Sequence, residues 1–246
     1  MKKTYPLFAL LSCLVLHTSP AVFAADLNAP LRPVADLKRD PSSHPLETLT
    51  LLNLKPGMQV LDLFAGAGYF SELLAQDVGP TGTVYLHNNQ AYVEYVGQQL
   101  TDRLGNQRLA NVKDWRKEIT QLDLPATSLD AVLFVMGYHD LYHTAKDWPK
   151  IDETQLMDQL KTALKPGGYL LVIDHAATAG SGVSAAQNLH RIDVAYTRDN
   201  LVKQGFKFVS SHSFLANPAD NHQLSAFDPA IRGKTDRFVL LFQKAQ

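Results

Sequence analysis

The chain has 246 residues, of which 46% are hydrophobic, and its formal net charge is −1 at pH 7. This balance fits one globular domain with an ordinary core and excludes a strongly basic surface, so we predict no nucleic-acid partner. The single cysteine is Cys13.

The first 24 residues have the pattern of a secretory signal peptide. Two lysines precede an apolar run over 7–16, and Val22-Phe23-Ala24 supplies the small residues of a cleavage site after Ala24. The apolar run is too short for a comfortable membrane span. We therefore predict an exported protein, periplasmic or secreted, without stable membrane insertion. Its mature chain, 25–246, has no cysteine for a disulfide or a thiolate metal site.

Residues 25–56 are predicted to form an N-terminal arm. Prolines and the lack of an apolar period predict an extended segment over 25–45, and leucines at helical spacing predict a helix over 46–54. Strands and helices then alternate. Strands are predicted over 58–63, 83–87, 109–115, 131–136, 169–173, 206–211 and 237–243. Helices are predicted after Gly68 and over 90–104, 154–164 and 193–204. This alternation predicts a single α/β domain with one doubly wound, mostly parallel sheet.

The turn after the first strand is the most informative segment. Asp62 lies at its mouth, and Gly66 and Gly68 have no Cβ that would keep a ligand from the backbone. The chain lacks the third glycine that a pyrophosphate site prefers. This pattern favours a ligand that has an amino group and no phosphate. A tight turn that binds nothing is the alternative.

Polar side chains follow the other predicted strands at the edge where such sheets bind ligands. Asn88 stands after the second strand, where nucleoside-binding folds carry an acid for the ribose. His139 and Asp140 follow the fourth strand, and Asp174 and His175 follow the fifth. The alternative is that these side chains only satisfy nearby backbone groups.

Two connections are unusual. The segment 176–186 is rich in Gly, Ala and Ser, and we predict a mobile loop. The segment 214–235, between the last two strands, is too long for a simple hairpin.

The glycine turn resembles the first motif of class I S-adenosylmethionine (SAM) methyltransferases. Leu129-Asp130-Ala131-Val132 resembles the approach to the fourth strand in these enzymes, and Leu164-Lys165-Pro166-Gly167-Gly168 resembles their turn before the fifth. More closely, the chain looks like a family of exported, predicted methyltransferases. Stretches that resemble that family lie at 138–140, 190–193, 217–220 and 227–236.

The resemblance implies a Rossmann-like, seven-stranded sheet whose last strand is antiparallel and lies between the fifth and the sixth. It also implies SAM as the cofactor. Asp62 would contact the methionine amino group, and Asn88 would contact the ribose. The backbone contacts would come from Ala65, Gly66 and Gly68, and the adenine contact from Glu118 or Asp123.

Methyl transfer requires alignment of the two substrates and removal of a proton from the acceptor. His139, beside Asp140, is the predicted general base because histidine titrates near neutral pH. His175 is the second candidate, and His190 with Arg191 is expected to close over the site. The predicted function is methyl transfer to a small-molecule acceptor.

Two other functions stay open. An inactive periplasmic binding module for a nucleoside-like or other small ligand would keep the fold, since SAM is made in the cytosol. A metal-assisted O-methyltransferase would use Asp174 as a ligand. No acid stands at the tip of the fourth strand, so we predict no metal site.

Overall fold

The computed structural model describes residue 1 and residues 24–148 and 150–245. The body of the predicted signal peptide, 2–23, lies outside the described residues. Within the described part of the chain, no helix is both long enough and apolar enough to cross a membrane.

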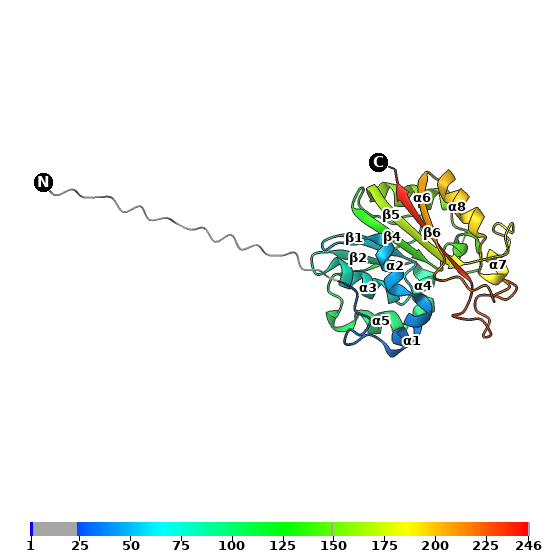
Figure 1. Cartoon of the computed structure of the whole chain (residues 1–246), viewed down its shortest axis with the longest axis horizontal. Helices are drawn as coiled ribbons and strands as arrows, with labels where there is room; N and C mark the ends of the chain where they lie inside the picture. The colour runs from blue at the N-terminus through cyan, green and yellow to red at the C-terminus, as the bar shows by residue number, and fades with distance from the viewer. Residues whose placement is uncertain (2–23, 149, 246) are drawn as a thin grey trace.

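Seven strands form one sheet in the spatial order β3-β2-β1-β4-β5-β7-β6 (Figure 1). The strands are β1 (Gln59–Leu63), β2 (Thr83–Asn88), β3 (Val112–Arg116), β4 (Leu129–Val135), β5 (Leu164–His175), β6 (Phe206–His212) and β7 (Arg237–Lys244). Strands β1 to β5 pair in parallel, and β7 runs antiparallel between β5 and β6. This arrangement confirms the predicted doubly wound sheet and its antiparallel last strand.

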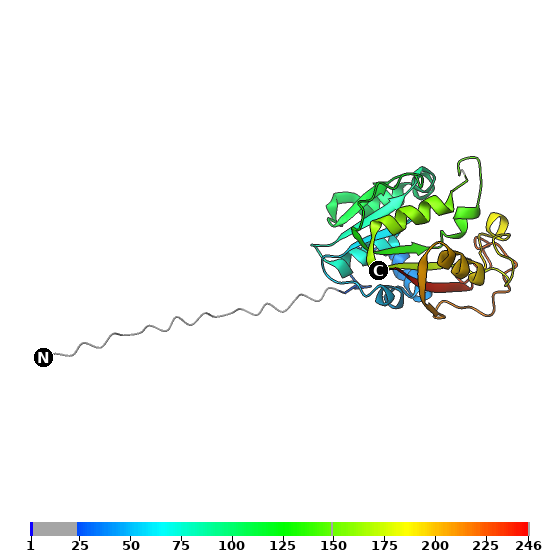
Figure 2. The ribbon, with the colours of Figure 1, turned by 90° about the horizontal axis from the view of Figure 1, so that it is seen from above.

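Helices cover both faces of the sheet (Figure 2). They are α1 (Val34–Ser43), α2 (Pro45–Leu52), α3 (Tyr69–Val78), α4 (Gln90–Val96), α5 (Gln98–Leu104), α6 (Glu153–Ala163), α7 (Ala186–Leu189) and α8 (Val194–Lys203). Successive strand residues point to opposite faces. Leu133 of β4 therefore packs with α2 and α3, and its neighbour Val132 packs with α6 and α8.

The prediction of an extended segment over 25–45 is wrong for its second half, which forms α1. This helix buries acids instead of an apolar stripe. Asp36 pairs with Arg103 at 2.8 Å, and Asp40 pairs with Arg32 at 2.7 Å. A helix whose inner face is charged has no apolar period for sequence analysis to detect.

Two further segments differ from the predictions. The helix predicted over 90–104 is interrupted at Gly97, whose φ of 51° is left-handed, and becomes α4 and α5. The segment 176–186 is fastened by Asp193, whose carboxylate accepts hydrogen bonds from the N–H groups of Gly180 and Gly182. The mobility of this segment stays a prediction.

Candidate active site

The glycine turn after β1 is held by contacts within the chain. Gly66 and Gly68 have φ values of 58° and 79°, which favour glycine. The buried Asn88 spans the turn, because its Oδ1 accepts from the Gly66 N–H and its Nδ2 donates to the Gly66 carbonyl, both at 2.9 Å. The Ala65 N–H donates to the His87 carbonyl, and the Gly68 N–H donates to the Ala65 carbonyl.

These bonds change the interpretation of the turn. Because Asn88 uses both polar atoms on Gly66, its observed role is to brace the turn, and a ribose contact stays a prediction. Gly68 also has a packing reason to be glycine. A Cβ there would lie 2.7 Å from Leu86 Cδ1 and 2.9 Å from Arg103 Cδ. The backbone contacts to SAM predicted for Ala65, Gly66 and Gly68 stay predictions.

Asp62 is a buried carboxyl group at the start of this turn. Burial raises its pKa to about 7, against the opposing effect of a 2.6 Å hydrogen bond from the Ser71 hydroxyl. A carboxylate that has lost its water gains from a nearby cation. The Asp62 environment therefore suits an ammonium group, and the contact with the methionine amino group that the resemblance implies stays a prediction.

Aromatic rings that were not predicted as site residues connect the glycine turn after β1 to the polar residues after β4. Phe64 stacks on Tyr92 of α4, with ring centroids 4.8 Å apart and an interplanar angle of 3°, and it also contacts Trp148. The Tyr92 hydroxyl donates to Asp140 Oδ2 at 2.8 Å. The Trp148 Nε1 donates to the Asp140 carbonyl at 2.9 Å. The turn after β1 and the polar residues after β4 are therefore one connected site.

His139 is the centre of this polar group and is almost fully buried. Its Nδ1 lies 2.7 Å from Asp174 Oδ1, and its Nε2 lies 3.2 Å from Asp140 Oδ1. Burial alone would lower the pKa of His139, but the two carboxylates outweigh it and raise the pKa to about 10. At neutral pH His139 is therefore an imidazolium, which must lose its proton before it can act as a base. Its role as general base stays a prediction.

Asp174 is saturated by the chain itself. Its carboxylate accepts hydrogen bonds from the His139 ring and from the main-chain N–H groups of His139 and His175. Asp174 therefore orients His139, and its oxygens have little capacity left for the metal-ligand role that the sequence analysis considered.

The two other candidate histidines, His175 and His190, differ in their contacts. His175 bonds through Nδ1 to the Thr235 hydroxyl at 2.7 Å, and burial lowers the pKa of its imidazole. His190 follows α7, and its ring centroid lies 5.4 Å from that of His139. The structure thus brings His139, Asp140, His175 and His190 together, as predicted.

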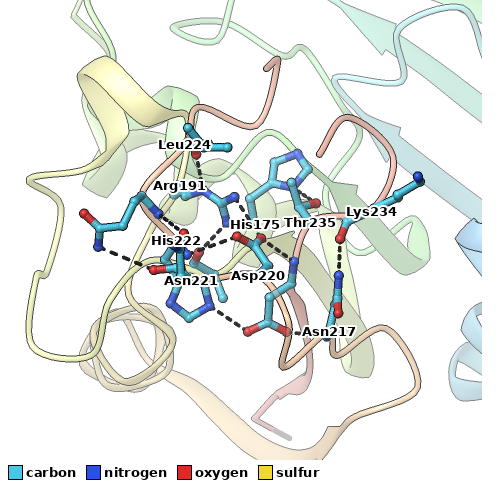
Figure 3. Close-up of polar contacts among 12 residues, drawn as sticks. His175, Arg191, Asn217, Asp220, Asn221, His222, Leu224, Lys234 and Thr235 are labelled. Atoms are coloured by element: carbon cyan, nitrogen blue, oxygen red, sulfur yellow. Dashed lines mark hydrogen bonds and ion pairs between the residues drawn. The ribbon is translucent and has the colours of Figure 1, made fainter. Parts of the chain in front are cut away.

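Arg191 does not take part in this centre. Its buried guanidinium pairs with Asp220 at 2.8 Å and donates to the carbonyls of Leu224 and Ala176 (Figure 3). The expectation that Arg191 closes over the site is wrong, because all three nitrogens of its guanidinium bind the chain.

Arg191 binds two residues of the long segment 214–235, Asp220 and Leu224. The Asn217 N–H and the His222 ring of this segment both bond to the Asp236 carboxylate (Figure 3). The segment also places Phe227 against the His190 ring, with centroids 4.6 Å apart. Through Phe227 the segment therefore borders the site beside His190.

The two acids considered for adenine occupy different places. Glu118 follows β3 and accepts a hydrogen bond from the Gln90 N–H at the start of α4, beside the end of β2. Asp123 is exposed and pairs with Lys117 at 2.5 Å. Glu118 therefore stays the candidate adenine contact, and Asp123 has a local partner instead.

The chain matches a family described as a methyltransferase domain over residues 54–209, more than half of its length. It is similar to the ubiquinone/menaquinone biosynthesis C-methyltransferase UbiE of Ectopseudomonas mendocina (strain ymp), with 33% identity over 128 residues, 52% of this chain and 45% of that protein. It is 26% identical over 177 residues to UbiE of Hahella chejuensis (strain KCTC 2396), covering 71% of this chain and 65% of that protein. The matches thus span about half to two thirds of these relatives.

Among solved structures, a SAM-dependent methyltransferase from Aquifex aeolicus has the same fold. It superposes with a TM-score of 0.61 at 19% identity, covering 84% of this chain and 92% of that chain. Fold, motif order and family match agree with the resemblance to class I SAM methyltransferases, and the resemblance to an exported family stays a prediction. The chain therefore belongs to the family of SAM-dependent methyltransferases with the class I fold.

Proposed function

We propose that the protein transfers the methyl group of SAM to a small-molecule acceptor outside the cytoplasm. One observation supports the proposed methyl transfer most directly. Strands β1 and β4 are neighbours, so the glycine turn and the His139–Asp140 group lie at the same sheet edge. Tyr92 joins them, because its ring stacks on Phe64 and its hydroxyl bonds to Asp140. A methyl donor at the turn would therefore be next to groups that can orient an acceptor.

The polar centre favours an acceptor with an ionisable oxygen. His139 offers a positive ring beside the carboxylate of Asp140, and Phe227 adds an apolar surface at His190. The UbiE relatives are named as C-methyltransferases of ubiquinone and menaquinone biosynthesis. Hydroquinones and phenols, which have both an ionisable oxygen and an apolar ring, are therefore the first acceptors to test.

The compartment is proposed from the N-terminal pattern. Two lysines, the apolar run over 7–16 and the small residues before Ala25 are typical of export. A periplasmic enzyme needs SAM delivered from the cytosol. This requirement makes SAM binding by the purified protein the first measurement.

The test combines calorimetry with a transfer assay that uses methyl-labelled SAM and a panel of phenols and hydroquinones. His139→Ala should reduce transfer by about 10²–10⁴-fold and leave SAM affinity nearly unchanged. His212→Gln, on β6, is the matched control and should behave as the wild type. SAM binding without transfer to any acceptor would support the binding module instead. A wild type that does not bind SAM would overturn the proposal.

A further inference from the structure

Three side chains of the polar centre converge on one point. His139 Nε2, Asp140 Oδ1 and His190 Nδ1 all lie within 4.8 Å of one another. Asp140 Oδ1 is 3.2 Å from the His139 nitrogen and 3.7 Å from the His190 nitrogen. In a tetrahedral site with bonds of about 2.0–2.1 Å, neighbouring ligand atoms lie about 3.3 Å apart. The two separations from Asp140 Oδ1 are close to that spacing.

His190 has an unused nitrogen at this point. Its Nδ1 is buried and has no hydrogen-bond partner among the residues that the structure describes. The 3.7 Å separation from Asp140 is too long for a hydrogen bond. The Nδ1 of His143, whose ring lies 4.9 Å from that of His190, is also buried without a partner in the described part of the chain. Buried polar atoms normally have hydrogen-bond partners, so these two nitrogens are available to bind a ligand.

The neighbours of these side chains orient them as metal ligands are oriented. Asp174 binds the His139 ring through Nδ1, which directs Nε2 toward Asp140 and His190. Tyr92 donates to Asp140 Oδ2, which leaves Oδ1 for the same point. A carboxylate behind a histidine is a common arrangement around bound zinc.

We propose that His139, Asp140 and His190 bind one divalent transition-metal ion such as Zn²⁺, and that the ion displaces the proton from Nε2 of His139. Two imidazoles and one carboxylate favour such an ion over Mg²⁺ or Ca²⁺, which prefer oxygen ligands. The carboxylates of Asp140 and Asp174 offset its two positive charges. Three protein ligands leave a position open.

A role for the open ligand position of the metal ion in methyl transfer rests on the proposed function. An oxygen of the acceptor bound there would be polarised by the ion, which favours its ionised form. This site differs from the prediction of no metal site, which rested on the acids at the strand tips, because His190 comes from a distant segment. Metal binding itself does not depend on methyl transfer and is measured separately.

The test uses the full purified chain after removal of metal with a chelator. Titration with Co²⁺, followed by visible absorption, and with Zn²⁺, followed by calorimetry, should show one ion per chain. His190→Gln should weaken binding by at least about 100-fold, and Asp174→Asn by about 10–100-fold. His44→Gln is the control, because His44 has a similar contact with an acid, Glu47, at the surface. It should leave the binding constant unchanged.

Two results would overturn the proposal. One is a wild type that binds no stoichiometric ion, and the other is a His190→Gln variant that binds as tightly as the wild type. His190 Nδ1 forms no hydrogen bond with the residues that the structure describes, so replacement of His190 should leave the circular dichroism spectrum of the folded chain unchanged. SAM affinity of the metal-free chain separates the two proposals. SAM binding without metal binding would refute only the metal site, and the reverse would refute only the proposed function.

Discussion

Asp62 should control SAM affinity through its charge. Its carboxyl group is buried, and burial raises its pKa to about 7. The ionised form is the one that attracts the ammonium group of SAM, so affinity should rise as the pH rises through this value. Between pH 6 and pH 8 the ionised fraction grows from about one tenth to about nine tenths. This change predicts an affinity gain of about tenfold, or about 1.4 kcal/mol.

The same raised pKa should lower stability at high pH. A carboxyl group with a pKa higher in the folded state than in the unfolded chain stabilises the fold fully below the unfolded value, near 3.8. That contribution is lost as the pH rises through about 7, and at most it amounts to about 4 kcal/mol. Asp62→Asn should therefore be more stable than the wild type at pH 8 and should bind SAM weakly at every pH.

Calorimetry at pH 6, 7 and 8 and constant ionic strength tests this reasoning. 5′-Methylthioadenosine is the matched ligand because it has the nucleoside and sulfur but no amino acid group. Its affinity should not follow the pH step. The reasoning is refuted if Asp62→Asn keeps the tenfold gain, or if methylthioadenosine shows the same gain as SAM.

Two other predictions follow from the contacts described above, and a third follows from the N-terminal sequence. Asn88→Asp should lower the melting temperature, because a carboxylate would face the Gly66 carbonyl; a higher melting temperature and tighter SAM binding would instead place the side chain at the ribose. Arg191→Met should reduce the unfolding free energy in urea by about 3–5 kcal/mol because it leaves a buried carboxylate unpaired, whereas the exposed Arg198→Ala should change it by less than about 0.5 kcal/mol. Equal effects of the two substitutions would contradict the role given to Arg191. The intact mass of protein made in a Gram-negative host should begin at Ala25, and a full-length product would contradict export.

The sheet could be predicted because its signals are local. Buried parallel strands are short apolar runs, and β1 and β4 have this pattern on both faces. Chain order then places residues such as His139 and His175 at one edge. The predicted site residues after β4 and β5 came together for this reason.

The remaining features depend on contacts between distant parts of the chain. Helix α1 has a charged inner face that matches Arg32 and Arg103, and no pattern within α1 shows those partners. Asn88 occupies a position typical of a ribose contact, but its partner is Gly66, 22 residues earlier. His190 becomes a neighbour of His139 only through the packing of α7 and Phe227. Spacing in the sequence contains none of this information.

The site can be tested with a crystal structure of the protein bound to S-adenosylhomocysteine. We expect the amino group of the ligand within hydrogen-bond distance of Asp62 and its sulfur between the glycine turn and His139. A ligand bound elsewhere on the chain, or no ligand at millimolar concentration, would contradict this expectation.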